Sequence, residues 1–340
     1  MIDLHGFTLG LVAILGTCVL FDYINGFHDT ANAIATSVST RALSPVAAIV
    51  LSATMNFVGA FTGTAVASTI GQGIVQNPDG SAGQVIIAAA LLGAILWNLL
   101  TWRLGIPSSS SHALIGGLVG ATVAGIGTSA VIGDGFVNKV LIPLVSSPVL
   151  GFLIAYALMV IIFNVFRRAD PARLNGRFRR LQVLSAAFMA FSHGSNDAQK
   201  TMGIMTLALV TAGVIPSFSV PVWVIVAAAS AISFGTAAGG WRIIRTMGQR
   251  VVALDPVHGF AAETTAASII LVASHFGAPV STTHVISSAI LGAGSSENLK
   301  RVRWGVARDI GVAWVLTLPA AALAAGVAWI VLHAVLSIGS

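Results

Sequence analysis

The chain has very little charge. Only 8% of its 340 residues are Asp, Glu, Lys or Arg, whereas 56% are hydrophobic, and the mean hydropathy is +0.92. Soluble domains carry about 25% charged residues. A chain this poor in charge cannot cover a soluble fold with a polar surface, so we expect lipid to be its main solvent.

Cysteine and the common catalytic motifs are also scarce. Cys18 is the only cysteine, so no intrachain disulfide can form and redox chemistry is disfavoured. The sequence contains no nucleotide-binding loop, no set of thiolate metal ligands and no nucleophile elbow. We therefore predict a protein that is not an enzyme and needs no cofactor. An intramembrane hydrolase stays open as an alternative, because four histidines lie near serines.

Long apolar runs are what the sequence has in abundance. Val85–Trp102, Leu141–Val165 and Ile310–Val335 are each about 18 residues or longer, enough to cross a bilayer as a helix. The runs are continuous and do not alternate with polar residues, which favours helices over a membrane barrel. Glycine is frequent, with 36 residues, as expected where membrane helices pack closely. The predicted fold class is an all-α polytopic membrane protein.

The basic residues gather in short segments between the apolar runs. Such clusters are typical of cytoplasmic loops under the positive-inside rule, so this pattern explains the net charge of +6 without a nucleic-acid partner. We expect an inner (plasma) membrane protein with both termini outside, and a first apolar run that is retained and not cleaved as a signal peptide. The clusters are Arg167, Arg168, Arg173, Arg177, Arg179 and Arg180; Arg242, Arg245 and Arg250; and Lys300, Arg301, Arg303 and Arg308.

This orientation predicts about ten crossings, five in residues 1–165 and five in residues 181–340, joined by a basic linker at 166–180. We expect the first crossing to be broken near Asn25–Asn32, and some crossings could be re-entrant pairs. The predicted spans are Gly6–Ala42, Pro45–Ile74, Val85–Trp102, His112–Val131, Leu141–Val165, Leu181–Gly213, Val222–Ala238, His258–Phe276, Pro279–Gly294 and Ile310–Val335.

Two motifs occur once in each half, in the same order. "NGFHDTANA" and "SHGSNDAQKTMG" place Asp29 and Asp197 168 positions apart. "LGIPSSSSHALIGGLVGA" and "FGAPVSTTHVISSAILGA" place His112 and His284 172 positions apart. An odd number of spans per half makes the two copies enter from opposite sides, so the sequence predicts an inverted-topology repeat, a common plan of secondary transporters.

The first motif suits a cation. An acid inside a membrane is a functional candidate, and carboxylate, amide and unwound backbone oxygens together can bind an ion. The alternative is a pair of hydrogen-bonded clamps between helices. The candidate coupling-cation residues are Asn25, Asp29, Asn32, Asn196, Asp197 and Gln199.

The second motif suits an oxyanion. Each copy places a proline and hydroxyl residues before a new apolar run, as at a capped helix start, where free N–H groups and the helix dipole attract anions. Ordinary capping of two membrane helices is the alternative. The candidate phosphate-binding residues are Ser108, Ser109, Ser110, Ser111, Ser281, Thr282 and Thr283, joined by Lys200, which could instead be a snorkelling surface lysine.

Four further ionisable residues are candidates for a proton relay: Asp22, Glu263, His112 and His284. Histidine titrates near physiological pH, although a structural role for each imidazole is open too. Glu263 has no acidic counterpart in the first half, where Leu91 occupies the equivalent position, so a symmetric ion site does not explain it.

The motifs resemble the PiT family of inorganic phosphate transporters in its bacterial low-affinity branch. The resemblance rests on "FDYINGFHDTANAIAT", "LWNLLTWRLGIPSSSSHALIGG", "AFSHGSNDAQKTMG", "GGWRIIRTMG" and "GAPVSTTHVISSAILG", which span nearly the whole chain. It implies symport of inorganic phosphate with a cation by alternating access, in a dimeric inner-membrane protein. It also implies that the Asn/Asp segments hold the cation and the hydroxyl segments hold phosphate.

The resemblance leaves the coupling ion open. Sodium-coupled eukaryotic relatives tend to carry glutamate in the second span, where this chain has Asn56. The bacterial branch is usually proton-coupled and is associated with phosphate carried as a neutral divalent-metal complex. We therefore favour H⁺; only if the ion is Na⁺ would Asp29 and Asp197 be metal ligands. Remaining alternatives are a permease for sulfate or another tetrahedral oxyanion, and a passive channel.

Overall fold

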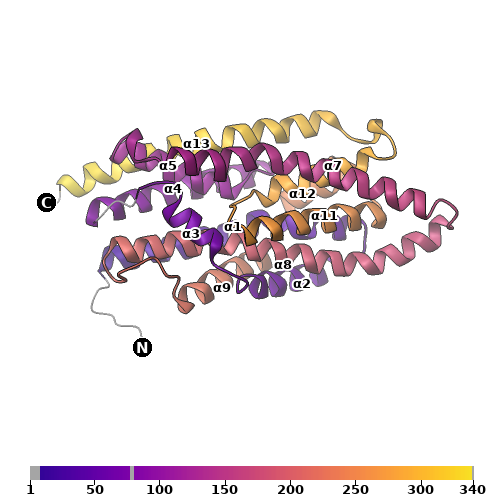
Figure 1. Cartoon of the computed structure of the whole chain (residues 1–340), viewed down its shortest axis with the longest axis horizontal. Helices are drawn as coiled ribbons and strands as arrows, with labels where there is room; N and C mark the ends of the chain where they lie inside the picture. The colour runs from indigo at the N-terminus through magenta and orange to yellow at the C-terminus, as the bar shows by residue number, and fades with distance from the viewer. Residues whose placement is uncertain (1–7, 77–79, 339–340) are drawn as a thin grey trace.

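The computed structural model describes residues 8–76 and 80–338, and these residues form helices without a β-sheet (Figure 1). Residues 1–7, which include the start of the first predicted span at Gly6, and Asn77–Asp79 of the loop before the third span lie outside the described residues. The confirmed fold class is therefore all-α.

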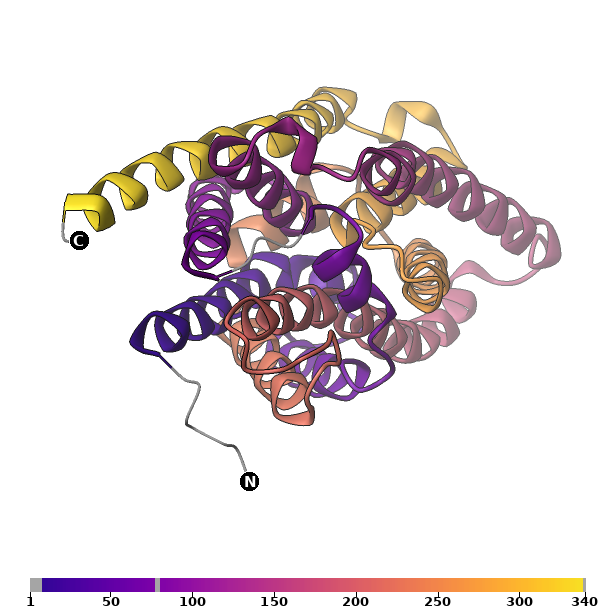
Figure 2. The same cartoon turned by 60° about the vertical axis from the view of Figure 1, so that its left-hand side comes forward.

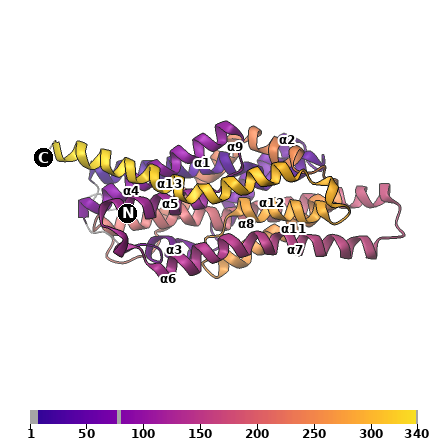
Figure 3. The same cartoon turned by 90° about the horizontal axis from the view of Figure 1, so that it is seen from above.

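The long helices run along one common direction, as Figure 3 shows, with α7 along one edge. Short 3₁₀ and π segments, η1–η4, lie between them. The α-helices are α1 Leu9–Ser39, α2 Pro45–Gly59, α3 Ala65–Gln72, α4 Gly80–Leu104, α5 Ser110–Gly125, α6 Gly133–Phe136, α7 Ile142–Val165, α8 Pro171–Thr211, α9 Val222–Ala238, α10 Trp241–Arg245, α11 Pro256–His275, α12 Thr282–Ser295 and α13 Trp304–Ile338.

Several of these helices are long and apolar enough to cross a bilayer. Among the described residues, five meet both criteria, or six if the bent pair α9 and α10 counts as one span. This number is lower than the ten predicted crossings for two physical reasons. Helices α5 and α12 have only 16 and 14 residues, and α8, although 41 residues long, carries a polar stretch in its middle. A multi-pass membrane protein is confirmed.

The prediction of a broken first helix is wrong. Helix α1 is continuous through Asn25–Asn32, and α8 is continuous through the equivalent stretch around Asp197. The motif glycines allow close helix packing instead of unwinding. A Cβ on Gly26 would lie 2.3 Å from the Ile232 carbonyl oxygen of α9, and one on Gly194 would lie 2.2 Å from the Asn56 carbonyl oxygen of α2.

Breaks occur instead within the second predicted span of the first half and directly after the second predicted span of the second half. Pro45–Ile74 divides into α2 and α3 at residues 60–64, where the Thr62 hydroxyl donates to the Gly59 carbonyl 2.7 Å away and contacts the Ser195 hydroxyl on α8. In the second half, α9 and α10 are bent by 61° at Gly239, whose φ of +75° is in the region that favours glycine.

Two hairpins bring the hydroxyl motifs into the interior. Gly105 follows α4 with φ +70° and Gly277 follows α11 with φ +66°. In each hairpin the chain therefore reverses at a glycine in the left-handed conformation. Proline follows two residues later in both turns. The chain then enters α5 or α12, whose first residues are buried in the middle of the molecule (Figure 1).

Helices of the two halves pack in reciprocal pairs. Helix α1 packs on α9 as α8 packs on α2, and α5 packs on α13 as α12 packs on α7. Figure 2 shows α13 lying along α4 and α5, with its last turns extending beyond them. This exchange places the equivalent motifs of both halves against one another at the centre.

We predict that the tight contact of α1 with α9 is sensitive to one methyl group. Gly26→Ala should lower the free energy of unfolding by about 1–3 kcal/mol, because the new Cβ overlaps a backbone carbonyl. Gly16→Ala in the same helix is the matched control, since nothing lies within 4 Å of its added Cβ. The thermal unfolding midpoints of the purified variants in detergent measure the difference, and equal midpoints would contradict this packing argument.

Candidate functional site

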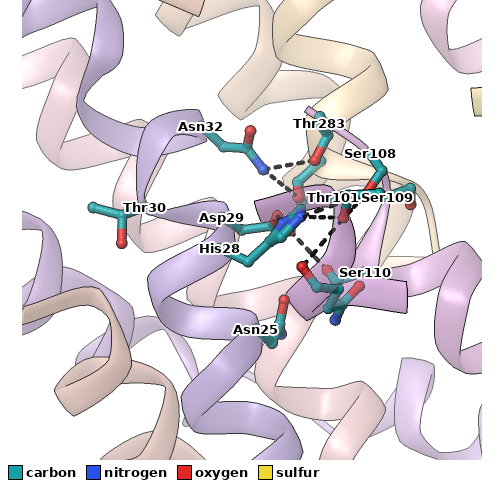
Figure 4. A network of polar contacts seen from close by, with 12 residues as sticks. Asn25, His28, Asp29, Thr30, Asn32, Thr101, Ser108, Ser109, Ser110 and Thr283 are labelled. Carbon is teal, nitrogen blue, oxygen red and sulfur yellow. Dashed lines mark hydrogen bonds and ion pairs between the residues drawn. The ribbon is translucent and has the colours of Figure 1, made fainter. Parts of the chain in front are cut away.

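Four helices meet at the centre of the molecule: α1, α8 and the first turns of α5 and α12. Figure 4 shows Asp29 and Asn32 of α1 pointing toward the hydroxyl residues, whereas Thr30 points away from them. The motif side chains from both halves are at most 2% exposed in this region. A polar cluster of this size in an apolar interior requires that its members satisfy one another.

The predicted helix starts are confirmed. Ser109 caps α5 by accepting a hydrogen bond from the His112 backbone N–H at 3.1 Å, and Ser281 caps α12 through the His284 N–H at 3.2 Å. The following residues present their hydroxyl groups to α1 and α8. The imidazoles of His112 and His284 lie with ring centroids 4.8 Å apart, so the two helix starts face each other.

Each motif aspartate contacts the helix start of its own half. The Ser110 hydroxyl donates to Asp29 Oδ2 at 2.7 Å, and the Thr282 hydroxyl donates to Asp197 Oδ2 at 3.2 Å. The two carboxylates and His193 offer ligand atoms within 4.8 Å of one another, so a single ion could reach all three. The structure thus brings together two acids that are 168 positions apart in the sequence.

The residue three positions after each aspartate contacts the helix start of the other half. Asn32 donates to the Thr283 hydroxyl of α12 at 2.9 Å, and Lys200 donates to the Ser111 hydroxyl of α5. Lys200 also pairs with Asp197 and donates to the Val280 carbonyl at 3.0 Å. At 2% exposure it is buried, so the surface-lysine alternative is wrong.

An imidazole contacts each of the two carboxylates. His28 Nδ1 lies 2.6 Å from Asp29 Oδ1, and its Nε2 lies 3.1 Å from the hydroxyl of Thr101 on α4. Ser108 donates to that same hydroxyl at 2.8 Å. Ser108, one of the predicted phosphate-binding residues, therefore helps to position His28 and precedes the start of α5.

Asp197 has an equivalent support built from different residues. His193 Nε2 lies 3.1 Å from Asp197 Oδ2, and its Nδ1 lies 3.1 Å from Asn56 Oδ1. Asn56 in turn donates to the Thr236 hydroxyl at 2.9 Å. Thr236 was not identified from the sequence, whereas His193 lies inside the quoted motif, four residues before Asp197.

The cluster carries more negative than positive charge. Asp29 and Asp197 supply two carboxylates and Lys200 supplies one cation, which leaves a formal charge of −1 when the imidazoles are neutral. Two helical turns before Asp29, Asp22 accepts from Asn25 Nδ2 at 3.2 Å. Asp22 Oδ2 and Asn25 Oδ1 have no hydrogen-bond partner among the described residues. Uncompensated buried acceptors are expected where a cation or proton binds.

Two candidate cation residues lie apart from the carboxylates. Gln199 Oε1 accepts from the Val66 backbone N–H at 2.9 Å and so satisfies the start of α3. Asn196 donates to the Ser274 hydroxyl at 2.8 Å and to the Ala278 carbonyl at 3.2 Å, beside the α11–α12 turn. Gln199 also lines a cleft of about 480 Å³ between the α2–α3 break and the end of α11.

Glu263 belongs to a separate buried cluster. Thr36 of α1 and Ser185 of α8 donate to its two oxygens at 2.5 Å, and Gln182 donates at 3.2 Å. These donors were not identified from the sequence, because their hydroxyl and amide groups are isolated in apolar runs. Glu263 therefore joins α1, α8 and α11 and does not contact the central carboxylates.

The comparisons with known proteins agree with one another. The model of the family described as "Phosphate transporter family" matches residues 25–176 and 166–325. A Bacillus subtilis protein named "probable low-affinity inorganic phosphate transporter" is 49% identical over 325 residues, which cover 95% of this chain and 97% of the relative. A Rhizobium meliloti protein with the same name is 48% identical over 315 residues, covering 92% and 93%.

A solved structure has the same fold. It is titled "The sodium-dependent phosphate transporter", superposes with a TM-score of 0.90 at 25% identity, and the match covers 96% of this chain and 99% of that chain. The likeness therefore extends over almost all of both chains.

We predict that Lys200 and Asp197 depend on each other for stability. Lys200→Met should lower the free energy of unfolding by about 3–5 kcal/mol, because it leaves a buried carboxylate unpaired. The double variant Lys200→Met/Asp197→Asn should lose less than the two single variants together. Thermal unfolding in detergent measures all three.

Asn32→Leu is the control for this pair, since Asn32 occupies the equivalent position in the other half and makes only neutral hydrogen bonds. It should cost about 1 kcal/mol. Additive losses in the double variant would show that the pair is not coupled.

Proposed function

The chain belongs to the phosphate transporter family, so its substrate is phosphate, and we propose that it carries inorganic phosphate across the membrane by symport with a coupling cation. The observation that carries the proposal is the meeting of two capped helix starts at a buried cluster of net negative charge. The helix starts provide what an anion needs, and the carboxylates provide what a cation needs.

The anion would bind between the starts of α5 and α12. Free backbone N–H groups of a first helical turn and the positive end of the helix dipole stabilise an oxyanion. Ser110, Ser111, Thr282 and Thr283 would add hydroxyl donors, and Lys200 would offset part of the phosphate charge. Ser109 and Ser281 would hold the helix starts open in the required geometry through their caps.

The cation is required by electrostatics. Phosphate entering beside Asp29 and Asp197 would face two carboxylates with only one buried ammonium to offset them. A cation or proton bound by these acids brings the site toward neutrality, so phosphate and cation would bind better together than separately. This mutual dependence is the coupling mechanism that we propose.

The residues that support Asp197 bear on which cation is coupled. Asn56, and not a glutamate, faces His193, so this part of the cluster carries one carboxylate fewer than a sodium-coupled relative would have. We therefore favour H⁺, with Asp22, Asp29 and Asp197 as proton carriers and Glu263, His112 and His284 as further candidates. In favour of Na⁺ is the similar solved structure, which is that of a sodium-dependent phosphate transporter. The ligand atoms of Asp29, His193 and Asp197 also suit phosphate that travels as a divalent-metal complex.

Alternating access would use the two halves as inverted repeats, residues 1–165 and 181–340. Reciprocal packing supports the repeat, and so does a matched pair of contacts at the hairpin turns. Thr69 of α3 donates to the Gly277 carbonyl at 2.7 Å, and Thr246 of η3 (Thr246–Arg250) donates to the Gly105 carbonyl at 2.9 Å. Breaking one contact while keeping the other would open the centre to one side at a time. We also propose a homodimer in the inner membrane, with both termini outside.

Uptake of radiolabelled phosphate into proteoliposomes tests the proposal. We expect accumulation against a phosphate gradient when a proton gradient is imposed alone, because the carboxylates would bind protons. Accumulation only under a sodium gradient would identify Na⁺ as the ion. Flux without accumulation would indicate a channel and overturn symport. Sulfate in excess should leave uptake unchanged; strong competition would favour a general oxyanion permease, which helix N-termini alone cannot distinguish.

Removing one carboxylate should weaken the coupling. In Asp197→Asn we expect the stimulation of uptake by the coupling cation to fall about tenfold, because the buried charge that links cation and phosphate is lost. Asp170→Asn is the control, since Asp170 caps the start of α8 at the exposed surface. Uptake is normalised to folded protein, and an unchanged cation dependence in Asp197→Asn would refute the proposed mechanism.

A further inference from the structure

A second cluster of ionisable side chains lies at the base of the α11–α12 hairpin, away from the central site. Asp255 caps the start of α11: its Oδ1 accepts from the Val257 N–H at 3.0 Å and from the His258 N–H at 3.1 Å. Glu297 follows the end of α12. The start of one helix and the end of the next thus contribute acids to the same place.

His258 lies between these two acids with one nitrogen unused. Its side chain is 1% exposed, and Nδ1 lies 2.8 Å from Asp255 Oδ1, which places the ring proton on Nδ1 and the lone pair on Nε2. Nε2 is buried and has no hydrogen-bond partner among the described residues. It faces Glu297 Oε1 at 3.8 Å, longer than a hydrogen bond but short enough for one ion to reach both atoms.

Asp255 holds the imidazole from the side of Nδ1, and Glu297 faces it from the side of Nε2. One atom each from Asp255, His258 and Glu297 lie within 4.8 Å of one another. Arg301 pairs with Glu297 Oε2 and donates to the Ala253 carbonyl at 3.3 Å, so Glu297 Oε1 is the oxygen that faces the imidazole.

We propose that His258 Nε2 and Glu297 Oε1 bind a first-row divalent cation such as Zn²⁺, while Asp255 holds the imidazole in place through Nδ1. A buried imidazole whose other nitrogen is held by a carboxylate is the usual form of a histidine metal ligand. An imidazole nitrogen beside a carboxylate suits Zn²⁺ better than Ca²⁺ or Mg²⁺, which take oxygen ligands. The ion would join the two arms of the hairpin that carries the start of α12, at the opposite end from that start.

The consequence is a second role for the hairpin, beyond the proposed transport function. A cation that joins α11 to the segment after α12 would restrain the hairpin from the end that bears the arginine-rich α7–α8 loop (Figure 1). The central cluster of Asp29, His193 and Asp197 is a separate group. Metal binding here is therefore independent of whether phosphate transport is coupled to H⁺ or to Na⁺.

Calorimetric titration of the purified full-length protein with Zn²⁺, in phosphate-free buffer and detergent, tests the site. Glu297→Gln should weaken the binding of one Zn²⁺ by at least about tenfold, since a ligand carboxylate is lost. Arg301→Gln breaks the same ion pair but keeps the ligand, so it should bind Zn²⁺ as tightly as the wild type or more tightly.

Asp170→Asn, an exposed helix-capping acid, is the control that should leave Zn²⁺ binding unchanged. Thermal unfolding without metal verifies that each variant is folded. Equal Zn²⁺ binding by the wild type and Glu297→Gln, or no binding by the wild type, would overturn the proposal. Equal weakening in Glu297→Gln and Arg301→Gln would also overturn it, because it would assign Glu297 to the ion pair alone.

Discussion

Two carboxylates buried at the meeting point of two helix starts are the constraint on which the rest of the structure depends. Asp29 and Asp197 cannot be ionised in an apolar interior without partners. Each therefore accepts from a hydroxyl of its own half and is supported by an imidazole. The helices that carry these partners must approach closely from four directions, so the electrostatic requirement determines where α1, α8, α5 and α12 lie.

Glycine makes that approach possible. Gly26 and Gly194 allow α9 and α2 to touch the backbones of α1 and α8, and Gly235 and Gly59 do the same from the other side. Lipid does not drive membrane helices together as water would, so close backbone packing and interhelical hydrogen bonds must hold them. The same glycines that suggested unwinding in the sequence keep α1 and α8 continuous, and a continuous helix holds Asp29 and Asn32 at a fixed angle toward different partners.

The sequence predicted the fold class, the helix starts and the pairing of motifs because each depends on local chemistry. Proline followed by hydroxyl residues is a local capping signal, and α5 and α12 begin within three residues of the predicted positions. The supports of the site were not predictable in this way. Thr101 reaches His28 across 73 positions, and Thr36 reaches Glu263 across 227, so only the folded chain shows that these isolated hydroxyls have partners. Gln199 was misplaced for the same reason, because its partner is a backbone N–H of α3.

The two halves make equivalent backbone contacts but carry different charges. This difference affects the relative energies of the inward-open and outward-open states that we propose. Asn32 and Lys200 occupy equivalent positions, yet only Lys200 brings a cation, and it contacts the start of α5. Glu263 likewise has only Leu91 as its counterpart. Breaking the Thr246 contact would let the hydroxyls of α5 move relative to the ammonium of Lys200. Breaking the Thr69 contact would let the hydroxyls of α12 move relative to the uncharged amide of Asn32. The two movements would therefore differ in electrostatic energy. If the protein alternates between two orientations, as we propose, identical halves would give the two orientations equal energies, whereas these differences between the halves would make them unequal before any ion or phosphate binds.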